Sequence, residues 1–366
     1  MSFPALKSIP ITYNDLDIQE TLCTGNLSIV QSAIIKDGGS IVALKKYDKL
    51  LLEKSKKIEE ALMEKHILAR LCHPNIVRSF ASFSTARNDF LVTEICERGD
   101  LWKICRGWGH PDNIVRGFVS QLACAVRYMH RAGVIHRDIK AENIFVSNDL
   151  TLKLGDFGAA RDMFNSRIKA SSTSSFRTCF EHFVGTPNFM APEAIANEAN
   201  DSLSDIWSLG CTIYQILVGI PPFVASSEYF TFLRVAHRDI LFPPTGISES
   251  AMKFVTDILT PKREARMTLE AMLTHPFMTT DPMSDMIYSP EDTLIMKICV
   301  GASHAELIEK CMMAQSIIDP RVLRRVLWAE EWRLKSEPGA GAAALLHLNL
   351  PELEEDYAYL RTKGKV

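Results

Sequence analysis

Four polar side chains in the middle of the chain have the types and spacing that transfer of a phosphoryl group requires. Asp138, Lys140 and Asn143 stand close together, and Asp156 follows as the first residue of Asp-Phe-Gly. Asp138 can accept the proton of an attacking hydroxyl, and Lys140 can neutralise charge on the moving group. Asn143 and Asp156 offer oxygen atoms, the ligands that Mg²⁺ prefers. The pattern therefore predicts phosphoryl transfer from a magnesium nucleotide, with these four residues in these roles.

Order along the chain gives this pattern its weight. Lys45 ends a Val-Ala-Leu-Lys run upstream, and Glu64 falls on the helix expected after it. Lys45 is expected to reach the α and β phosphates, and Glu64 to hold it by an ion pair. Each residue taken alone has an ordinary explanation, since loop aspartates form turns and most Lys–Glu pairs are weak surface contacts. Together and in order, they favour the catalytic interpretation.

Length and composition fit a globular protein larger than one average domain. The chain has 366 residues, 47% of them hydrophobic and 23% charged, with a net charge of −3. This charge gives no reason to expect nucleic acid or an anionic membrane as partner. Nine cysteines without a CxxC pair predict reduced thiols and a cytoplasmic location, with nuclear shuttling left open. Residues 1–14 show no signal peptide, and the apolar stretch 206–223 favours a buried helix over a membrane span.

Hydrophobic periodicity predicts a strand-rich first part and a mostly helical second part. Asp-Gly-Gly at 37–39 predicts a hairpin, because these residues tolerate positive φ. In the first part we expect strands at 29–35, 41–47, 77–83 and 90–95 and a helix at 54–71, with Ile58, Leu62, Leu68 and Leu71 on its apolar face. In the second part we expect a long helix with a stripe from Ile114 to Met129, strands at 144–146 and 152–154, and helices at 204–218, 228–237, 249–259 and 268–273.

These motifs resemble those of eukaryotic protein kinases over residues 14–278. Lys140, and Gly185-Thr186-Pro187 ahead of Ala191-Pro192-Glu193, resemble serine/threonine kinases. The resemblance implies an α+β, bilobal protein-kinase fold that uses ATP and Mg²⁺ to phosphorylate proteins. It implies a small antiparallel β-sheet lobe with one helix at 14–95, a larger helical lobe at 100–278, and a helical C-terminal extension of unknown role at 279–366.

The same resemblance implies roles for residues outside the central window. Thr186 would contact Asp138 and Lys140, Glu193 would pair with Arg266, and Asp205 would brace the loop that carries Asp138. Thr93 resembles the gatekeeper of the nucleotide site. Further residues implied at the nucleotide are Leu22, Thr24 and Gly25 of the glycine-rich loop, Val30, Ala43 and Phe145 around the adenine ring, and the backbone of Glu94 and Cys96.

Several stretches resemble the 3-phosphoinositide-dependent protein kinase family of the AGC group. They are residues 211–219, Pro221-Pro222-Phe223, Glu228-Tyr229-Phe230 and residues 183–186. Members of that family phosphorylate other AGC kinases, so protein substrates of that kind are implied. Their PH domain is not expected here, because residues 279–366 have helical periodicity. Phosphoinositide binding is therefore not expected. Nucleic-acid binding and integral membrane association are not expected either.

Two departures from the kinase pattern leave alternatives open. Cys23 and Ser28 replace glycines of the glycine-rich loop, and only Gly25 remains. Because glycines let backbone N–H groups approach phosphates closely, Cys23 is expected to weaken nucleotide binding. A pseudokinase that binds partners without phosphoryl transfer therefore stays an alternative. A small-molecule phosphotransferase is another, although residues 185–193 resemble a segment that seats a peptide.

Regulation and partner docking are also left open by the sequence. His182 stands where relatives carry a phosphorylatable residue that docks on Arg137, and a histidine cannot supply a dianion. Three alternatives stay open. Thr178 or a nearby serine is phosphorylated in place of residue 182, or the segment becomes ordered without a phosphate. In the third alternative, the segment is a polar loop with no regulatory role. The resemblance also implies a peptide groove beside the 54–71 helix, but Phe83 and Leu68 fit core packing better. The extension packs on the large lobe or offers a docking surface.

Overall fold

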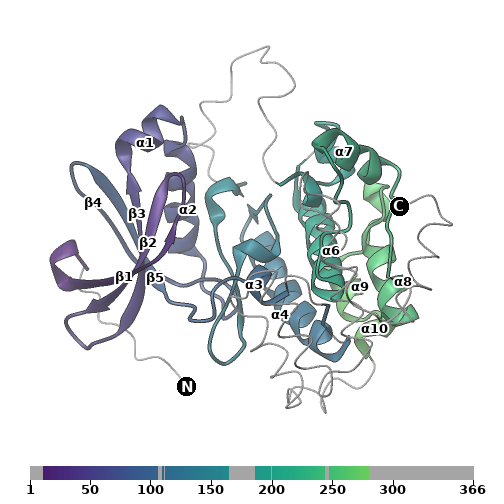
Figure 1. The fold of residues 1–366 in the computed structure, drawn as a ribbon, viewed down its shortest axis with the longest axis horizontal. Coiled ribbons are helices and arrows are strands. Elements are labelled where there is room, and N and C mark those ends of the chain that lie inside the picture. Colours follow the sequence, from purple (N-terminus) through teal and green to yellow (C-terminus); the bar gives the residue numbers. More distant parts are fainter. Residues whose placement is uncertain are drawn as a thin grey trace, which may run out of the picture. The chain divides into compact units, whose positions relative to one another are not determined.

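The structure is a computed structural model that describes residues 11–105, 109–110, 112–164, 186–198, 200–243 and 247–279 (Figure 1). The described residues divide into two compact units. The first comprises residues 11–99, 124–136 and 145–164, and the second comprises residues 100–123, 137–144 and the described residues from 186 onward. The predicted extension and most of the segment around His182 lie outside the described residues.

The first unit is built on a five-stranded antiparallel sheet with the strand order β1-β2-β3-β5-β4 (Figure 1). Gly38 and Gly39 have φ values of +94° and +66° between β2 and β3, which confirms the predicted hairpin and its need for glycine. The four predicted strands begin and end within two residues of the second to fifth observed strands, and the first observed strand was not predicted. The strands are β1 (Leu16–Thr24), β2 (Ser28–Ile35), β3 (Ile41–Asp48), β4 (Ser79–Ser84) and β5 (Asn88–Glu94).

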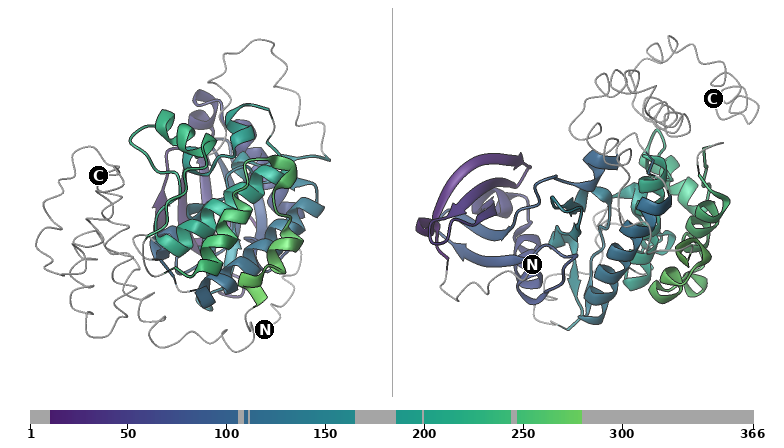
Figure 2. Two further views of the ribbon diagram at one scale, coloured as in Figure 1. Left: turned by 90° about the vertical axis from the view of Figure 1, so that its right-hand side faces the viewer. Right: turned by 90° about the horizontal axis from the view of Figure 1, so that it is seen from below.

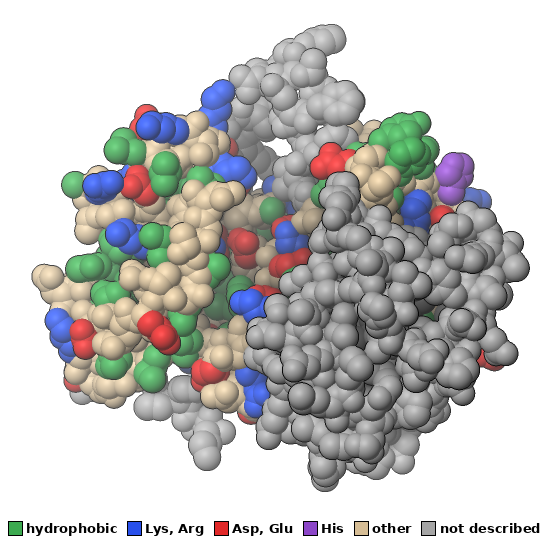
Figure 3. Space-filling model, in the orientation of Figure 1, with side chains coloured by type: hydrophobic (Ala, Val, Ile, Leu, Met, Phe, Trp, Pro, Cys, Tyr) green, Lys and Arg blue, Asp and Glu red, His purple; other side chains and the backbone are tan. Residues whose placement is uncertain are grey.

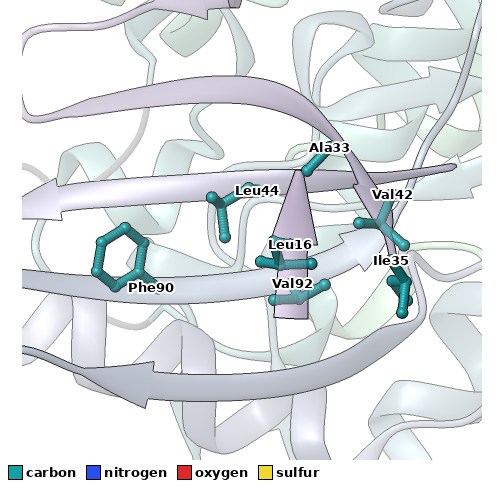
Figure 4. Close-up of a cluster of buried hydrophobic side chains, with 7 residues drawn as sticks. All are labelled: Leu16, Ala33, Ile35, Val42, Leu44, Phe90 and Val92. Atoms are coloured by element: carbon teal, nitrogen blue, oxygen red, sulfur yellow. The ribbon is translucent and has the colours of Figure 1, made fainter. Parts of the chain in front are cut away.

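One face of this sheet carries a hydrophobic core. Val42 and Leu44 of β3 are both buried in it. Because side chains alternate along a strand, the residues between and after them, Ala43, Lys45 and Tyr47, share the opposite face of β3. The core cluster consists of Leu16, Ala33, Ile35, Val42, Leu44, Phe90 and Val92 (Figure 4).

Two helices, not the single helix expected, accompany the sheet. Helix α1 (Lys49–Lys54) is capped at its N-terminus by Asp48, whose carboxylate accepts hydrogen bonds from the backbone N–H groups of Leu50 and Leu51. Helix α2 (Ile58–Arg70) follows after Lys56, which has a positive φ of 55°. The helix predicted at 54–71 therefore forms as α2 but begins four residues later, and α1 was not predicted, because the capping role of Asp48 and the break at Lys56 were not recognised.

Of the four residues expected on the apolar face of this helix, Leu68 and Leu71 are buried, at 3% and 5% exposure, and the other two are not. Ile58 and Leu62 are 43% and 50% exposed, whereas Ala61 and Glu64 are buried together with Ile67 and Leu68. The helix is thus rotated so that a carboxylate faces the sheet. Leu68 is buried, and the partly buried Phe83 stacks on Phe90 with ring centroids 4.9 Å apart, so both residues take part in core packing.

The second unit is mostly helical. Helix α6 (Ser202–Val218) is buried from Ser204 to its end, as expected for a core helix. Helix α8 (Glu249–Ile258) packs on α6, and α10 (Pro276–Thr279) packs on α8 and on α9 (Leu269–Leu273), an arrangement that can be followed in green in Figure 2. The other helices are α3 (Leu101–Cys105), α5 (Pro192–Ile195), α7 (Glu228–Ala236), α8 (Glu249–Ile258), α9 (Leu269–Leu273) and α10 (Pro276–Thr279).

The expected α+β class, with an antiparallel sheet and a helical part, is confirmed. Helix α4 (Asp112–Arg131) contributes residues to both units. The short strands β7 (Ile144–Val146) and β8 (Leu152–Leu154) form where they were predicted. In the described part of the chain, no helix is both long and apolar enough to cross a membrane.

Apolar side chains remain exposed on α7. Tyr229, Phe230 and Leu233 are 66%, 53% and 37% exposed, and the space-filling view shows green atoms gathered over this helix at the upper right (Figure 3). Tyr229 and Phe230, which belong to the Glu228-Tyr229-Phe230 stretch that supported the family resemblance, therefore lie at the surface and contribute little to the core.

Candidate functional site

The first unit positions Lys45 through the sheet. Strand β3 lies between β2 and β5, so Lys45 pairs with Val30 on one side and Leu91 on the other. Its Nζ donates to both carboxylate oxygens of Glu64 on α2, at 2.9 and 2.8 Å. The expected ion pair is therefore formed, and its carboxylate is only 5% exposed.

The charges around Lys45 keep it protonated. Burial alone would lower the pKa of Lys45, but the carboxylates of Glu64 and Asp156 outweigh burial and raise that pKa well above its usual value. Asp156 Oδ1 lies 3.8 Å from the Lys45 Nζ. A permanent positive charge with a partly accessible carboxylate beside it suits a phosphate and its metal ion.

Local backbone geometry presents Asp156 to solvent. Asp156 follows β8 and has left-handed backbone angles, φ 56° and ψ 70°, and its side chain is 48% exposed. Phe157 beside it is buried, with its ring centroid 4.8 Å from that of His136. The His136 imidazole is in turn 3.0 Å from the carbonyl oxygen of Gly155. These contacts fix the turn, so the Asp156 carboxylate is the part of the motif left accessible.

All residues implied at the nucleotide fall in the first unit. The sheet register places Ala43 opposite Thr93. Phe145 packs so closely on Gly155 that a Cβ at Gly155 would come within 2.8 Å of its ring. The implied residues lie on β1 (Leu22, Thr24), between β1 and β2 (Gly25), on β2 (Val30), on β3 (Ala43, Lys45), on and after β5 (Glu94, Cys96) and on β7 (Phe145).

The side chains of Glu94 and Cys96 are not available as reactive groups. Glu94 accepts a hydrogen bond from the backbone N–H of Arg78 at 2.7 Å and lies 3.0 Å from the Lys153 Nζ. Burial raises the pKa of the Cys96 thiol to about 12, so it stays protonated. The backbone contacts to adenine implied for both residues stay a prediction.

The glycine-poor hairpin closes without strain. The Gly25 N–H donates to the Ser28 carbonyl at 2.8 Å, and Cys23 pairs with Val30 across the two strands. The positive-φ residues of the described chain do not include Cys23, Gly25 or Ser28. No position in this hairpin therefore requires glycine for its backbone conformation. The expected effect of Cys23 on nucleotide binding stays a prediction.

The second unit surrounds the Asp138 carboxylate with donors. Oδ1 accepts from the backbone N–H of Thr186 at 3.1 Å and from its hydroxyl at 3.0 Å. Oδ2 lies 2.7 Å from the Lys140 Nζ and accepts from the Asn143 amide at 2.9 Å. The Lys140 Nζ also donates to the Thr186 hydroxyl at 2.6 Å. The contacts implied for Thr186 are therefore confirmed, and they fix the carboxylate in one orientation.

Hydrogen bonds from Asn143, at the end of the loop, and to Asp205, on α6, hold the loop around Asp138 in place. The Asn143 amide nitrogen also donates to the Asp138 carbonyl at 2.8 Å. Both of these bonds use the nitrogen of the amide, so its oxygen is the atom suited to a metal ion. Arg137 has a positive φ of 68°, and its N–H donates to the Asp205 carboxylate at 2.8 Å. The bracing role implied for Asp205 is thus confirmed.

Three contacts of α2 were not anticipated. The Tyr47 hydroxyl donates to Glu64 Oε2, and its position two residues after Lys45 on the same strand face was a signal available in the sequence. At the other end of the helix, His66 and Arg70 both contact the buried Asp162 of β9 (Arg161–Asp162). Asp162 carries no comparable sequence signal, because its partners lie far along the chain.

Comparison with known proteins identifies the family. Residues 16–278 match the family model described as protein kinase domain. The chain belongs to this family. A 3-phosphoinositide-dependent protein kinase 1 of Arabidopsis thaliana is 33% identical over 73% of this chain and 55% of the relative. A 3-phosphoinositide-dependent protein kinase B of Dictyostelium discoideum is 32% identical over 73% of this chain and 29% of the relative.

The likeness extends beyond the phosphoinositide-dependent kinases. A serine/threonine-protein kinase Aurora-1 of Arabidopsis thaliana is 33% identical over 76% of this chain and 90% of the relative. The expected resemblance to phosphoinositide-dependent kinases is confirmed, at an identity that an Aurora kinase matches. The chain spans about half or less of the phosphoinositide-dependent relatives named above.

Proposed function

We propose that the chain is an ATP-dependent serine/threonine protein kinase whose domain extends over residues 14–278. The partly buried Lys45–Glu64 pair, at 2.8 Å, is the observation that carries this proposal, because a kinase uses such a pair to hold the lysine that binds the nucleotide phosphates. The Asp138 carboxylate, oriented by Lys140, Asn143 and Thr186, supports it. Action of the two sets of residues on one nucleotide is part of the proposal.

The residues present suit Mg-ATP. Mg²⁺ supplies neutralisation of charge on the phosphates when bound, and it takes few protein ligands, which the Asn143 amide oxygen and the Asp156 carboxylate would provide. Lys45 binds the α and β phosphates through its permanent charge. Asp138 accepts the proton of a substrate serine or threonine hydroxyl at its carboxylate, and Lys140 neutralises charge that develops on the transferred group.

The proposed substrates are proteins, other AGC-type kinases among them. The support is the likeness to phosphoinositide-dependent kinases, together with the resemblance of residues 185–193 to a peptide-seating segment. Cytoplasmic location is part of the same proposal, and the six described cysteines, all free thiols, support it. The test is incubation of the purified chain with labelled ATP, Mg²⁺ and peptides from AGC activation segments, with Asp156→Ala as the inactive control.

A scaffold without catalysis is the second candidate, and the glycine-poor hairpin with Cys23 favours it. The same experiment separates the two. Label transferred to peptide by the wild type but not by Asp156→Ala supports a kinase. Binding of ATP without any transfer, to peptides or to the chain itself, supports the scaffold. Transfer to a small metabolite in place of peptides would support the phosphotransferase alternative.

Replacing Cys23 by glycine is expected to tighten ATP binding. The hairpin needs no glycine for its conformation, so the change acts through closer approach of phosphates to the backbone. A gain of one weak backbone hydrogen bond, about 0.5–1 kcal/mol, would lower the KM for ATP by roughly two- to fivefold. Steady-state kinetics with varied ATP measures this.

Cys23→Ser is the matched control for that experiment. It removes the thiol but keeps a Cβ substituent, so the KM for ATP is expected to stay at the wild-type value. A KM that falls equally in both variants would assign the effect to the thiol and contradict the backbone explanation.

A further inference from the structure

Glu64 has a second donor besides Lys45. The hydroxyl of Tyr47 donates to Glu64 Oε2, the same oxygen that accepts from the Lys45 Nζ at 2.8 Å. Lys45 and Tyr47 are two residues apart on β3, so both side chains leave the strand on the face turned to α2. The carboxylate therefore receives hydrogen bonds from two donors on one strand.

This arrangement is buried. Tyr47 and Glu64 are 5% and 4% exposed. Burial raises the pKa of the Tyr47 phenol, and the charge of Glu64 raises it further, so the hydroxyl keeps its proton and donates at any physiological pH. A buried carboxylate is stable only when donors satisfy it, and a charged acceptor makes the hydrogen bond stronger than one between neutral groups. Tyr47 therefore helps to keep the Glu64 carboxylate turned toward β3.

The strand makes Tyr47 a stiff anchor. Its backbone pairs with Ser28 of β2 and Asp89 of β5, and its side chain has fewer rotatable bonds than that of a lysine. The Lys45 Nζ lies 5.3 Å from the centre of the ring, within the range of a cation–π contact. The ring thus supports the ammonium while the hydroxyl supports the carboxylate.

We propose that Tyr47 is a positioning residue for phosphoryl transfer, which acts by holding Glu64 so that Lys45 stays in place for the nucleotide phosphates. This inference rests on the proposed kinase function and adds to it a residue that touches neither substrate nor nucleotide. The proposed role depends on the single hydrogen bond from the Tyr47 hydroxyl to Glu64, so removal of this hydroxyl alone tests the proposal.

Tyr47→Phe in the full chain removes that hydroxyl and keeps the ring. We expect kcat/KM for ATP to fall about tenfold, as for loss of one hydrogen bond to a charged group, with affinity for a fluorescent ATP analogue in Mg²⁺ lowered as well. The matched control is Tyr214→Phe, which removes another buried tyrosine hydroxyl, the donor to the Leu241 carbonyl in the second unit. This control is expected to lower thermal stability comparably and to leave the KM for ATP unchanged.

A double-mutant cycle with Glu64→Gln shows whether Tyr47 acts through Glu64. Analogue affinity should fall on Tyr47→Phe in the wild type and change much less when Glu64 is already replaced. Unchanged affinity and KM in Tyr47→Phe, or the same loss in both backgrounds, would overturn the proposal. A wild type that binds the analogue without transferring phosphate defeats the proposed kinase function but leaves this binding test decisive. A wild type that binds no analogue overturns both.

Discussion

Replacing Asp138 by asparagine is expected to slow phosphoryl transfer by a factor of about 10²–10⁴, the range that a positioned general base contributes. The amide keeps the shape of the side chain but cannot take the proton of a substrate hydroxyl. It also places an NH₂ group among donors, because Lys140, Asn143 and Thr186 all direct hydrogen bonds at this carboxylate. Transfer of label from saturating ATP to peptide measures the loss.

Two comparisons give this result its meaning. Lys45, Glu64 and Asp156 belong to the first unit and are unchanged, so affinity for an ATP analogue is expected to stay close to that of the wild type. Asp257→Asn removes a partly exposed carboxylate that pairs with Lys253 at 2.7 Å, a contact of small energetic value, and should leave turnover unaltered. Full turnover in Asp138→Asn would remove the base from the mechanism.

Local sequence signals predicted most of the fold. Strands β7 and β8 and helices α6 to α9 form within two residues of the predicted bounds, because their apolar period or their flanking turns are strong. Helix α1 was missed, since its start depends on one capping aspartate, Asp48. The rotation of α2 was missed for a different reason. Periodicity counts apolar residues as the buried ones, and here Glu64 takes a core position.

In the site, too, residues in sequence motifs were predicted and residues outside such motifs were missed. Motif spacing predicted the Lys45–Glu64 pair, because these residue types occur in a known order, and the resemblance to kinases implied the contacts of Asp138 with Thr186. Tyr47 and Asp162 belong to no such motif. Their partners come from α2, and a contact between a helix and a strand distant in the sequence depends on the packed structure. Whether the residues of the two units act on one nucleotide stays a prediction.

Replacing Arg266 by methionine is expected to cost about 3–5 kcal/mol of unfolding free energy, as for a buried ion pair that loses one partner. The Arg266 guanidinium is fully buried and bonds both oxygens of Glu193, at 2.6 and 2.9 Å. This confirms the implied pair. Urea unfolding at neutral pH measures the loss. Arg263→Met is the matched control, because its pair with Asp201 is partly exposed and should contribute less than about 1 kcal/mol.

The dependence of this loss on pH identifies Glu193 as its cause. Burial alone would raise the pKa of Glu193, but the hydrogen bonds and charge of Arg266 outweigh burial and lower that pKa below its usual value of 4.5. A carboxyl with a lowered pKa stabilises the fold fully above its unfolded pKa, and this stability is lost as pH falls through the folded pKa. The difference between wild type and Arg266→Met should thus be largest near pH 7 and shrink below about pH 4.5.

Glu193→Gln added to Arg266→Met should recover part of the loss, because it removes the unpaired charge. An equal difference at all pH values, with no recovery, would assign the loss to packing of the Arg266 side chain on Trp207, whose ring centre is 5.1 Å from the guanidinium carbon.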